Sequence, residues 1–347
     1  MPESDNERYL RQITCPQIGE EGQQKLLTSR VLLVGCGALG TTIAETLGRA
    51  GVGFLRIADR DFVELNNLQR QVLFDENDVK LRRPKAAAAA EKLSVMNSGI
   101  TIEPHVVDVN HASLPSLADG IDLILDGTDN FETRYLINDF AVQHGMPWVY
   151  GAAVATTGLC MPVIPGETAC LRCLFEDAPP PDMNPTCDTA GVLAMTVSLV
   201  ANLQCVEAMK ILTGNTDDLN RKLTHVDSWT PRIVSLKVER SQDKNGCPCC
   251  QRQEFPYLNG ERESKGTTLC GRNAVQIQPP TLTRLKLTDL AEKIREQAGE
   301  NLRINEYLLQ ADLEDVQLTL FHDGRAIIHG TEDIDRARSL VARYIGS

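Results

Sequence analysis

The residues that could carry out chemistry gather in one short stretch, Arg56–Gln71, which reads RIADRDFVELNNLQRQ. Two carboxylates follow an apolar run there, and amide and guanidinium side chains come directly behind them. Carboxylates can bind ribose hydroxyls or a divalent cation, whereas amides and arginines donate hydrogen bonds to phosphate oxygens. The combination indicates chemistry on a nucleoside triphosphate. Its candidate ligands are Asp59, Asp61, Asn66, Asn67 and Arg70.

A glycine-rich turn precedes this stretch, in the sequence VLLVGCGALG (31–40). Gly35, Gly37 and Gly40 have the spacing G-x-G-x-x-G, which is typical of a strand that feeds a phosphate-binding helix. Free N–H groups at the start of such a helix favour an anion. Asp59 lies at the tip of the next apolar run, where a carboxylate can reach a ribose hydroxyl. By itself this pattern also fits a nicotinamide oxidoreductase, or a tight turn in a protein without a nucleotide.

Two further segments favour a triphosphate over a dinucleotide. Lys85 opens the alanine-rich helix KAAAAAEKL and adds a second cation to Arg70 near the same predicted sheet edge. The segment DLILDGTDN (122–130) is typical of a buried strand that ends in carboxylates, where open α/β sheets bind ligands. Asp129 is the favoured candidate for holding magnesium. Asp126 is a second candidate, although it could be an ordinary strand-end cap.

The order and spacing of GCGALG, DRDFVELNNLQRQ, RPK and DGTDN resemble the ThiF/MoeB/HesA family, bacterial relatives of the ubiquitin-activating enzymes. RYLRQI (8–13) also resembles the amino terminus of this family, and the resemblance covers residues 7–253. It implies ATP-dependent adenylation of the C-terminal glycine of a ubiquitin-like sulfur carrier, with magnesium, in a homodimer. The carrier could be ThiS-like or MoaD-like, so thiamin and molybdopterin pathways stay open. A cysteine desulfurase or a rhodanese is a candidate sulfur donor.

The resemblance also implies roles for single residues. Asp59 would hold the ribose, Asp129 would take magnesium, and Arg11 resembles the arginine that family members send into the ATP site of the neighbouring subunit. Many members have glycine in place of Ala38, whose methyl group could narrow the approach of the backbone to the nucleotide. The implied nucleotide ligands are Gly35, Gly37, Ala38, Gly40, Asp59, Asp61, Asn66, Asn67, Arg70, Lys85, Asp129 and Asn130. The implied catalytic residues are Arg11, Arg70, Lys85, Asp129 and Cys187.

Two C-x-x-C pairs, Cys170/Cys173 and Cys247/Cys250, predict a zinc site with four thiolates. Such a closed tetrahedral site is structural, because it leaves no open position for a substrate. Many members of the family hold zinc with pairs in these places. Cys249 lies inside the second pair, so the choice of ligand there stays open, and four buried or redox-active thiols are the alternative.

Cys187 lies in a proline-rich segment, DAPPPDMNPTCDTAGVLAM, which indicates a loop before an apolar helix. In ThiF-like members a cysteine before such a T-A-G-V turn can attach covalently to the carrier. In MoeB-like members the cysteine of this region is dispensable. A thiolate near a helix start has a lowered pKa, and an adenylate is a strong acyl donor. A covalent role and an inert loop cysteine therefore both stay open.

Charge and composition narrow the choice of partner and compartment. The chain has 347 residues, a formal net charge of −12 and 11 cysteines. The acidic charge argues against nucleic acid and membrane as partners, which disfavours a tRNA-acting relative with the same ATP site. The absence of a signal peptide and the many cysteines favour the reducing cytoplasm. A non-catalytic scaffold that binds carriers is the remaining alternative, and the intact set of nucleotide ligands argues against it.

The predicted fold is α/β: a doubly wound, mostly parallel Rossmann-like sheet with a zinc-bound C-terminal part and a small α+β appendage. We expect an adenylation domain at 1–255, a linker at 256–271 and the appendage at 272–347. A long apolar helix at 190–213 carries polar residues, so a buried helix is favoured over a membrane span. In the appendage we expect a helix capped by Thr288, a hairpin at Asp323-Gly324 and a closing helix at 332–345. The appendage could be a docking site or a lid that supports a dimer.

Overall fold

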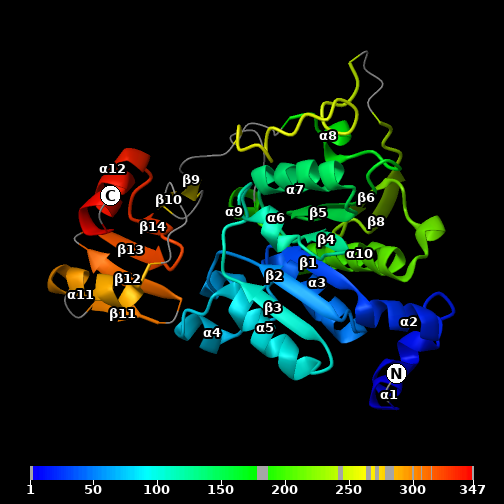
Figure 1. The fold of residues 1–347 in the computed structure, drawn as a ribbon, viewed down its shortest axis with the longest axis horizontal. Coiled ribbons are helices and arrows are strands. Elements are labelled where there is room, and N and C mark those ends of the chain that lie inside the picture. The colour runs from blue at the N-terminus through cyan, green and yellow to red at the C-terminus, as the bar shows by residue number, and fades with distance from the viewer. Residues whose placement is uncertain are drawn as a thin grey trace. The chain divides into compact units, whose positions relative to one another are not determined.

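The computed structural model describes residues 3–177, 187–240, 245–262, 267–269, 273–277, 285–298, 301–305, 307–313 and 315–345. The chain divides into two compact units, Met1–Arg262 and Glu263–Ser347 (Figure 1). Residues 256–262, which the sequence assigned to a linker, lie in the first unit. Their attachment has a physical cause, because the Tyr257 ring stacks on Tyr135 at 4.9 Å and is buried there.

The first unit is built on an eight-stranded sheet with the order β3-β2-β1-β4-β5-β6-β7-β8. Strands β1 to β5 pair in parallel, and β6 to β8 continue the sheet as antiparallel neighbours. This mostly parallel α/β sheet confirms the predicted fold class. The strands are β1 Arg30–Val34, β2 Phe54–Ala58, β3 Thr101–His105, β4 Leu123–Asp126, β5 Trp148–Val154, β6 Thr157–Val163, β7 Leu223–Asp227 and β8 Arg232–Leu236.

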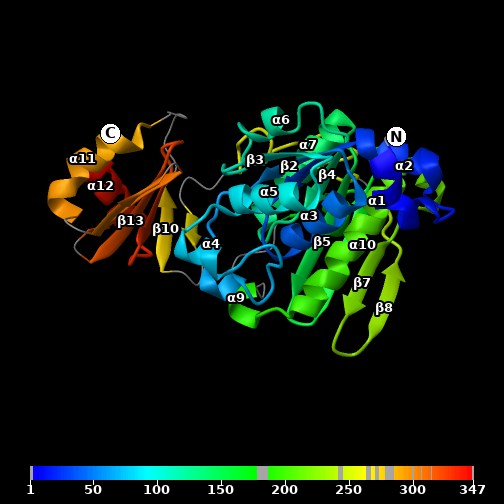
Figure 2. The same cartoon turned by 90° about the horizontal axis from the view of Figure 1, so that it is seen from below.

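Helices cover both faces of this sheet (Figures 1 and 2). Helices α3, α5 and α10 pack on one face, while α6 and α7 pack on the other. The helices of the first unit are α1 Glu3–Ile13, α2 Gly19–Thr28, α3 Ala38–Ala50, α4 Glu76–Lys80, α5 Lys85–Met96, α6 Leu114–Leu117, α7 Phe131–His144, α8 Leu171–Leu174, α9 Cys187–Ala190 and α10 Ala194–Thr213, with 3-10 turns η1 Leu65–Asn67 and η3 Thr216–Asp218.

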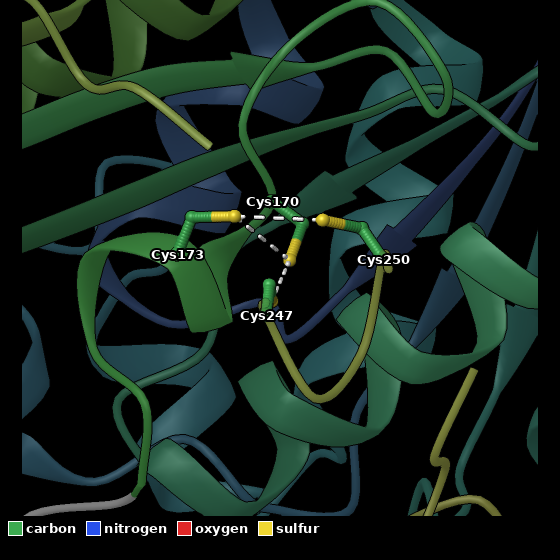
Figure 3. A group of neighbouring side chains, drawn as sticks. All are labelled: Cys170, Cys173, Cys247 and Cys250. Atoms are coloured by element: carbon green, nitrogen blue, oxygen red, sulfur yellow. Dashed lines mark hydrogen bonds between the residues drawn. The ribbon is translucent and has the colours of Figure 1, made fainter. Parts of the chain in front are cut away.

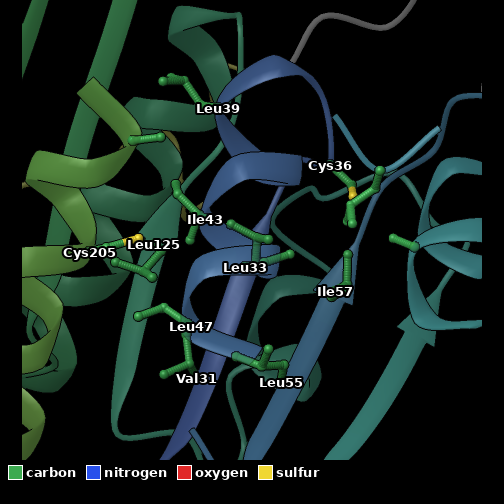
Figure 4. Packing of buried hydrophobic residues seen from close by; sticks show 14 of the residues in the cluster. Val31, Leu33, Cys36, Leu39, Ile43, Leu47, Leu55, Ile57, Leu125 and Cys205 are labelled. Carbon is green, nitrogen blue, oxygen red and sulfur yellow. The ribbon is translucent and has the colours of Figure 1, made fainter. Parts of the chain in front are cut away.

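The central strand β1 is apolar on both faces, because a parallel strand between two helical layers is buried on each side. Val31 and Leu33 lie against Ile43 of α3 and its neighbours (Figure 4). Leu32 belongs to the core of the opposite face. This double burial fixes where β1 ends, and so it fixes the position of the glycine turn that follows.

Helix α10 is long and apolar enough, by length and composition, to cross a membrane. It packs instead on the sheet, where Val200 and Ala201 are fully buried. Its buried Gln204 amide donates to the carbonyls of Asp126, at 2.8 Å, and Val149, at 3.2 Å. The helix ends at Gly214, whose φ of +83° provides the left-handed C-cap. The helix is therefore packed on the sheet as predicted, and only one side of it is buried.

The second unit is a six-stranded antiparallel sheet with the order β11-β12-β13-β14-β10-β9, and two helices pack on one of its faces. The turn between β13 and β14 lies at Asp323-Gly324, as predicted. Thr288 is not an N-cap, because α11 already begins one residue earlier. The elements are β9 Thr267–Leu269, β10 Ala274–Ile277, α11 Leu287–Ala298, β11 Leu302–Ile304, β12 Leu308–Leu313, β13 Val316–Phe321, β14 Ala326–His329 and α12 Ile334–Ile345.

Candidate functional site

The candidate site lies at the switch point of the sheet, where β1 has β2 on one side and β4 on the other. The loops after β1 and β4 touch at Gly35 and Gly127. A Cβ atom on Gly35 would lie 2.7 Å from the carbonyl of Gly127, and Gly35 has a φ of +88°. A side chain at this position would therefore be excluded by both its contact and its backbone conformation.

The other two glycines of the motif have different surroundings. A Cβ atom on Gly40 would lie 2.1 Å from the Gly35 carbonyl oxygen, so close packing of α3 on the turn requires glycine there. Among the described residues, the nearest neighbours of a Cβ atom on Gly37 would be Gln71 Nε2 and the Gly127 carbonyl oxygen, both at 4.0 Å. Gly37 is also the N-cap residue of α3 and provides no side-chain cap. The start of α3 is therefore partly exposed and has room for an added methyl group, which fits an anion site.

These surroundings predict that replacement by alanine has different effects at the two glycines. Gly40→Ala should destabilise the protein, because its methyl group collides with backbone that cannot move freely. Gly37→Ala should keep the melting temperature nearly unchanged, because the methyl group fits without a collision, and should weaken ATP binding, because it lies where the phosphates are proposed to bind. Thermal unfolding and equilibrium binding of ATP measure the two effects. Equal ATP affinity in Gly37→Ala and the unmodified protein would contradict this account of the turn.

A chain of polar contacts joins the glycine turn to α5. The Asp59 carboxylate accepts hydrogen bonds from the backbone N–H groups of Cys36 and Asp61, both at 2.6 Å. Lys85, which is buried, donates to Asp61 at 3.2 Å. Burial raises the pKa of Asp59, while the Lys85 ammonium acts in the opposite direction. The structure thus brings together three residues that the sequence selected separately.

The asparagine pair of the NNLQR segment shapes its own loop. Asn67 is buried, and its Oδ1 accepts from the Glu64 N–H at 3.1 Å in a capping box around η1. Its Nδ2 donates to Asn66 Oδ1 at 2.8 Å. The half-buried Arg70 donates to the Asn66 carbonyl, also at 2.8 Å. These contacts hold the loop in shape, a structural role that the motif by itself did not indicate.

The two aspartates after β4 differ sharply. Asp126 is fully buried and forms an ion pair with Arg134, whose Nε lies 3.0 Å from Oδ2. Its Oδ1 accepts from the backbone and hydroxyl of Thr128. Burial works against the charge on Arg134, yet Asp126 raises the Arg134 pKa above its ordinary value. Because its oxygens are occupied, Asp126 acts as the strand-end anchor that we considered as the alternative to a magnesium ligand.

Asp129 is exposed, and the described part of the structure shows no hydrogen bond or ion pair of its side chain. Its carboxylate is a hard oxygen donor at the carboxyl end of β4, which fits the ligand preference of magnesium. Asn130, a predicted nucleotide ligand, is the N-cap of α7 and accepts from the Thr133 N–H at 2.8 Å. The Arg134 guanidinium also donates to the Thr128 carbonyl and so holds the loop that carries Asp129.

The two cysteine pairs come together as predicted (Figure 3). The sulfur atoms of Cys170, Cys173, Cys247 and Cys250 all lie within 4.8 Å of one another. The separations are 3.9 Å for Cys170–Cys173, 3.6 Å for Cys170–Cys247 and 3.5 Å for Cys173–Cys250. A tetrahedral zinc ion about 2.3 Å from each sulfur would place the sulfurs about 3.8 Å apart. The set could therefore hold a structural zinc ion.

Cys249 is not one of these four residues, although its thiol also interacts with that of Cys170. It is fully buried, and its sulfur accepts from Asn138 Nδ2 at 3.2 Å, outside the group of four. Asn138 Oδ1 in turn accepts from the Leu171 N–H at 2.8 Å, so one amide of α7 links both cysteine-bearing segments. Sequence reasoning did not identify Asn138, because an asparagine inside an apolar helix gives no motif.

Arg11 and Cys187 are the remaining predicted site residues. Helix α1, which carries Arg11, packs at the far end of α3, where Gln12 donates to the Ala50 carbonyl at 2.9 Å. The glycine turn lies at the other end of that helix, about 20 Å away at 1.5 Å per residue. Cys187 begins α9, but its side chain lies outside the described residues. The structure therefore places Arg11 away from the glycine turn of the same chain, and it leaves the prediction for Cys187 untested.

Comparison with known proteins agrees with this geometry. The model of the ThiF family matches residues 9–249. The chain belongs to the ThiF family. It is 44% identical over 339 residues to the sulfur carrier protein ThiS adenylyltransferase of Bacillus subtilis, covering 98% of this chain and 99% of that protein. It is 38% identical over 251 residues to the Escherichia coli protein of the same name, covering 72% and 97%.

Solved structures give the fold alone. The crystal structure of Escherichia coli MccB with ATP superposes with a TM-score of 0.60 at 23% identity, covering 72% of this chain and 75% of that one. The matched fold agrees with the α/β sheet described above. The Escherichia coli relative has 97% of its length aligned with 251 residues of this chain, which is about the size of the first unit.

Proposed function

We propose that this protein is an adenylyltransferase that uses ATP to activate the C-terminal glycine of a ubiquitin-like sulfur carrier. The observation that carries the proposal is the convergence of the open glycine turn, Asp59 and Lys85 at the switch point of the sheet. A nearly full-length relative named as a ThiS adenylyltransferase supports both the reaction and a ThiS-like carrier, hence thiamin biosynthesis. A MoaD-like carrier is the second substrate to test.

Each side chain of the site has a task in this proposal. The N–H groups at the start of α3 bind phosphate oxygens, and Asp59 binds the ribose. Arg70 and Lys85 neutralise phosphate charge, for which Lys85 exchanges its contact with Asp61 for the nucleotide. Asp129 holds magnesium, which would neutralise charge on the phosphates when bound. The capping contacts of Asn67 and Asn130 keep the two loops in position.

The proposed reaction is an in-line displacement at the α-phosphate. A carboxylate oxygen of the terminal glycine forms a bond to the α-phosphorus, and the bond from that phosphorus to the bridging oxygen breaks. The electron pair of the broken bond leaves with pyrophosphate, and the carrier becomes an acyl-adenylate. The carboxylate is already ionised at neutral pH, so no general base is needed. Catalysis then depends on positioning and on stabilisation of phosphate charge.

Arg11 supports a homodimer in this proposal. Its position at the far end of α3, away from the glycine turn of the same chain, supports a role in the ATP site of a second copy. Helix α10 exposes an apolar row at helical spacing, Met195, Leu199 and Val206, of which Met195 is 64% and Val206 49% exposed. Trp229 and Ile233, at the β7–β8 edge, are also exposed. Such clustered apolar surface is typical of an interface between subunits.

Subunit complementation tests the role of Arg11. Arg11→Ala and Asp129→Ala should each be inactive alone. After mixing and refolding, a hybrid dimer has one intact site, in which the Asp129→Ala subunit supplies Arg11 to its partner. With equal amounts of the two subunits, about half of the dimers should be hybrids, each with one intact site of two. The mixture should therefore have about one quarter of the activity of the unmodified protein. Recovery of no activity, with hybrid dimers present by mass, would contradict the shared site.

The experiment that tests the function is ATP–pyrophosphate exchange by the purified protein, with ThiS-like and MoaD-like carriers ending in Gly-Gly. Exchange that depends on one carrier would support adenylation and identify the pathway. ATP binding without exchange with either carrier would favour another acyl acceptor, such as tRNA or a peptide. Failure to bind ATP would favour a scaffold. If the exchange assay supports adenylation, a cysteine desulfurase or a rhodanese is the proposed donor of sulfur to the carrier adenylate.

We also propose that the protein works in the cytoplasm. The cysteines whose side chains the structure describes are free thiols, including the group of four that could hold zinc. Thiol ligands and free cysteines persist in a reducing compartment. ATP and a soluble carrier are available there as well. Fractionation of cells that produce the protein at natural levels tests this location.

A further inference from the structure

One buried polar group beside the glycine turn has no place in the reaction described so far. Gln71 ends the NNLQRQ segment, and 3% of its surface is exposed. Its Oε1 is buried and lacks a hydrogen-bond partner in the described part of the structure. Its Nε2 lies 4.0 Å from the point where a Cβ atom on Gly37 would stand. The amide therefore lies beside Gly37 at the start of α3.

Burial of such an amide has a cost. A polar side-chain atom that leaves water without gaining a partner destabilises the folded protein. Methionine has a similar volume and would fill the position without that cost. Core packing alone therefore gives no reason for an amide here, whereas a polar ligand between Gln71 and the turn does. The glycine turn offers N–H donors, and the Gln71 amide offers a further one. The ligand that suits both is therefore an anion.

We propose that Gln71 positions the phosphates of ATP against the glycine turn, an inference that rests on the proposed function. Its Nε2 donates to a phosphate oxygen lying over Gly37, while its Oε1 accepts from water held with the nucleotide. Gln71 thus closes the side of the phosphate site opposite the N–H groups of α3. Arg70, the preceding residue, supplies charge to the phosphates, and Gln71 supplies a directional hydrogen bond.

Variants of matched size test this role. Gln71→Met removes both polar atoms, and Gln71→Glu keeps the shape but replaces the donor by a carboxylate. Gln69→Met is the control, because Gln69 is an exposed residue of the same segment. Binding of ATP and of adenosine is measured for each variant, together with the melting temperature and the KM for ATP in the exchange assay.

The expected results follow from loss of one hydrogen bond to a charged group. Gln71→Met should weaken ATP binding and raise the KM for ATP by about tenfold or more, with unchanged adenosine binding. Its melting temperature should be unchanged or higher, because an unpaired buried amide is removed. Gln71→Glu should weaken ATP binding further through repulsion of phosphate. Gln69→Met should match the unmodified protein.

Two results would overturn the inference. One is an ATP affinity of Gln71→Met equal to that of the unmodified protein. The other is a parallel loss of adenosine binding, ATP binding and thermal stability, which indicates that Gln71 only fills space. Both leave the proposed function intact, since the unmodified protein still catalyses exchange. Lack of ATP binding by the unmodified protein would instead remove the proposed function itself.

Discussion

Replacement of Asp129 by asparagine should lower kcat/KM for adenylation by about a hundredfold or more, because the proposed magnesium ligand loses its charge. The melting temperature should not change. Asp129 is exposed, and the described structure shows no side-chain hydrogen bond or ion pair that the substitution would break. Arg134 keeps the loop in place through the Thr128 carbonyl, and this contact does not involve the side chain at position 129. Exchange kinetics at several magnesium concentrations, with thermal unfolding, measure both effects.

Asp119→Asn is the matched control for this substitution. Asp119 is also exposed, and its replacement by asparagine removes the same charge. It lies before β4, however, whereas Asp129 lies after that strand. The control should retain full activity at every magnesium concentration. Full activity in Asp129→Asn, or equal losses in both variants, would show that Asp129 does not hold the metal of the reaction.

Loss of one ligand of the cysteine group should have the largest effect on stability. Cys250→Ser removes a thiolate from the four sulfurs, so zinc content should fall and the free energy of unfolding should decrease by several kcal/mol. The group joins the segment of α8 to a loop far along the chain, and both segments pack on α7 through Asn138. Metal analysis and thermal unfolding, with and without a chelator, measure the loss.

Cys249→Ser provides the control one residue away. Cys249 is buried, but its sulfur contacts Asn138 and lies outside the group of four. A serine hydroxyl can accept the same hydrogen bond, so this variant should keep its zinc and most of its stability. We expect a chelator to lower the melting temperature of Cys249→Ser, which keeps its zinc. The chelator should not change the melting temperature of Cys250→Ser, which has lost it. Zinc loss in Cys249→Ser with retention in Cys250→Ser would reverse the assignment of ligands.

The sequence predicted those features that depend on local pattern. Apolar strands, the glycine turn, the long core helix and the two cysteine pairs each have a spacing that a physical rule explains. The rule for the G-x-G-x-x-G spacing also gives each glycine its own role, with the second one, Gly37, where the backbone approaches phosphate. The contacts that set Gly37 apart are visible only in the structure. That distinction depends on the loop after β4, whose Gly127 contacts Gly35 and leaves Gly37 without a close neighbour.

Roles that depend on three-dimensional partners were less predictable. Asn67 and Asn130 belong to binding motifs, yet the structure uses their side chains as caps of η1 and α7. Asp126 looked similar to Asp129 in the sequence, and its burial beside Arg134 separates the two. Gln71 was not selected at all, because the cost of burying its amide is visible only once its surroundings are known.

The central claim concerns which bond of ATP is broken, and a label at the α-phosphate tests it most directly. The protein is incubated with a ThiS-like carrier and ATP labelled at either the α- or the γ-phosphate. We expect the α-label to appear on the carrier's C-terminus, with pyrophosphate as the released product. Release of γ-label as inorganic phosphate, with no label on the carrier, would contradict the account, because it would mean cleavage between the β- and γ-phosphates.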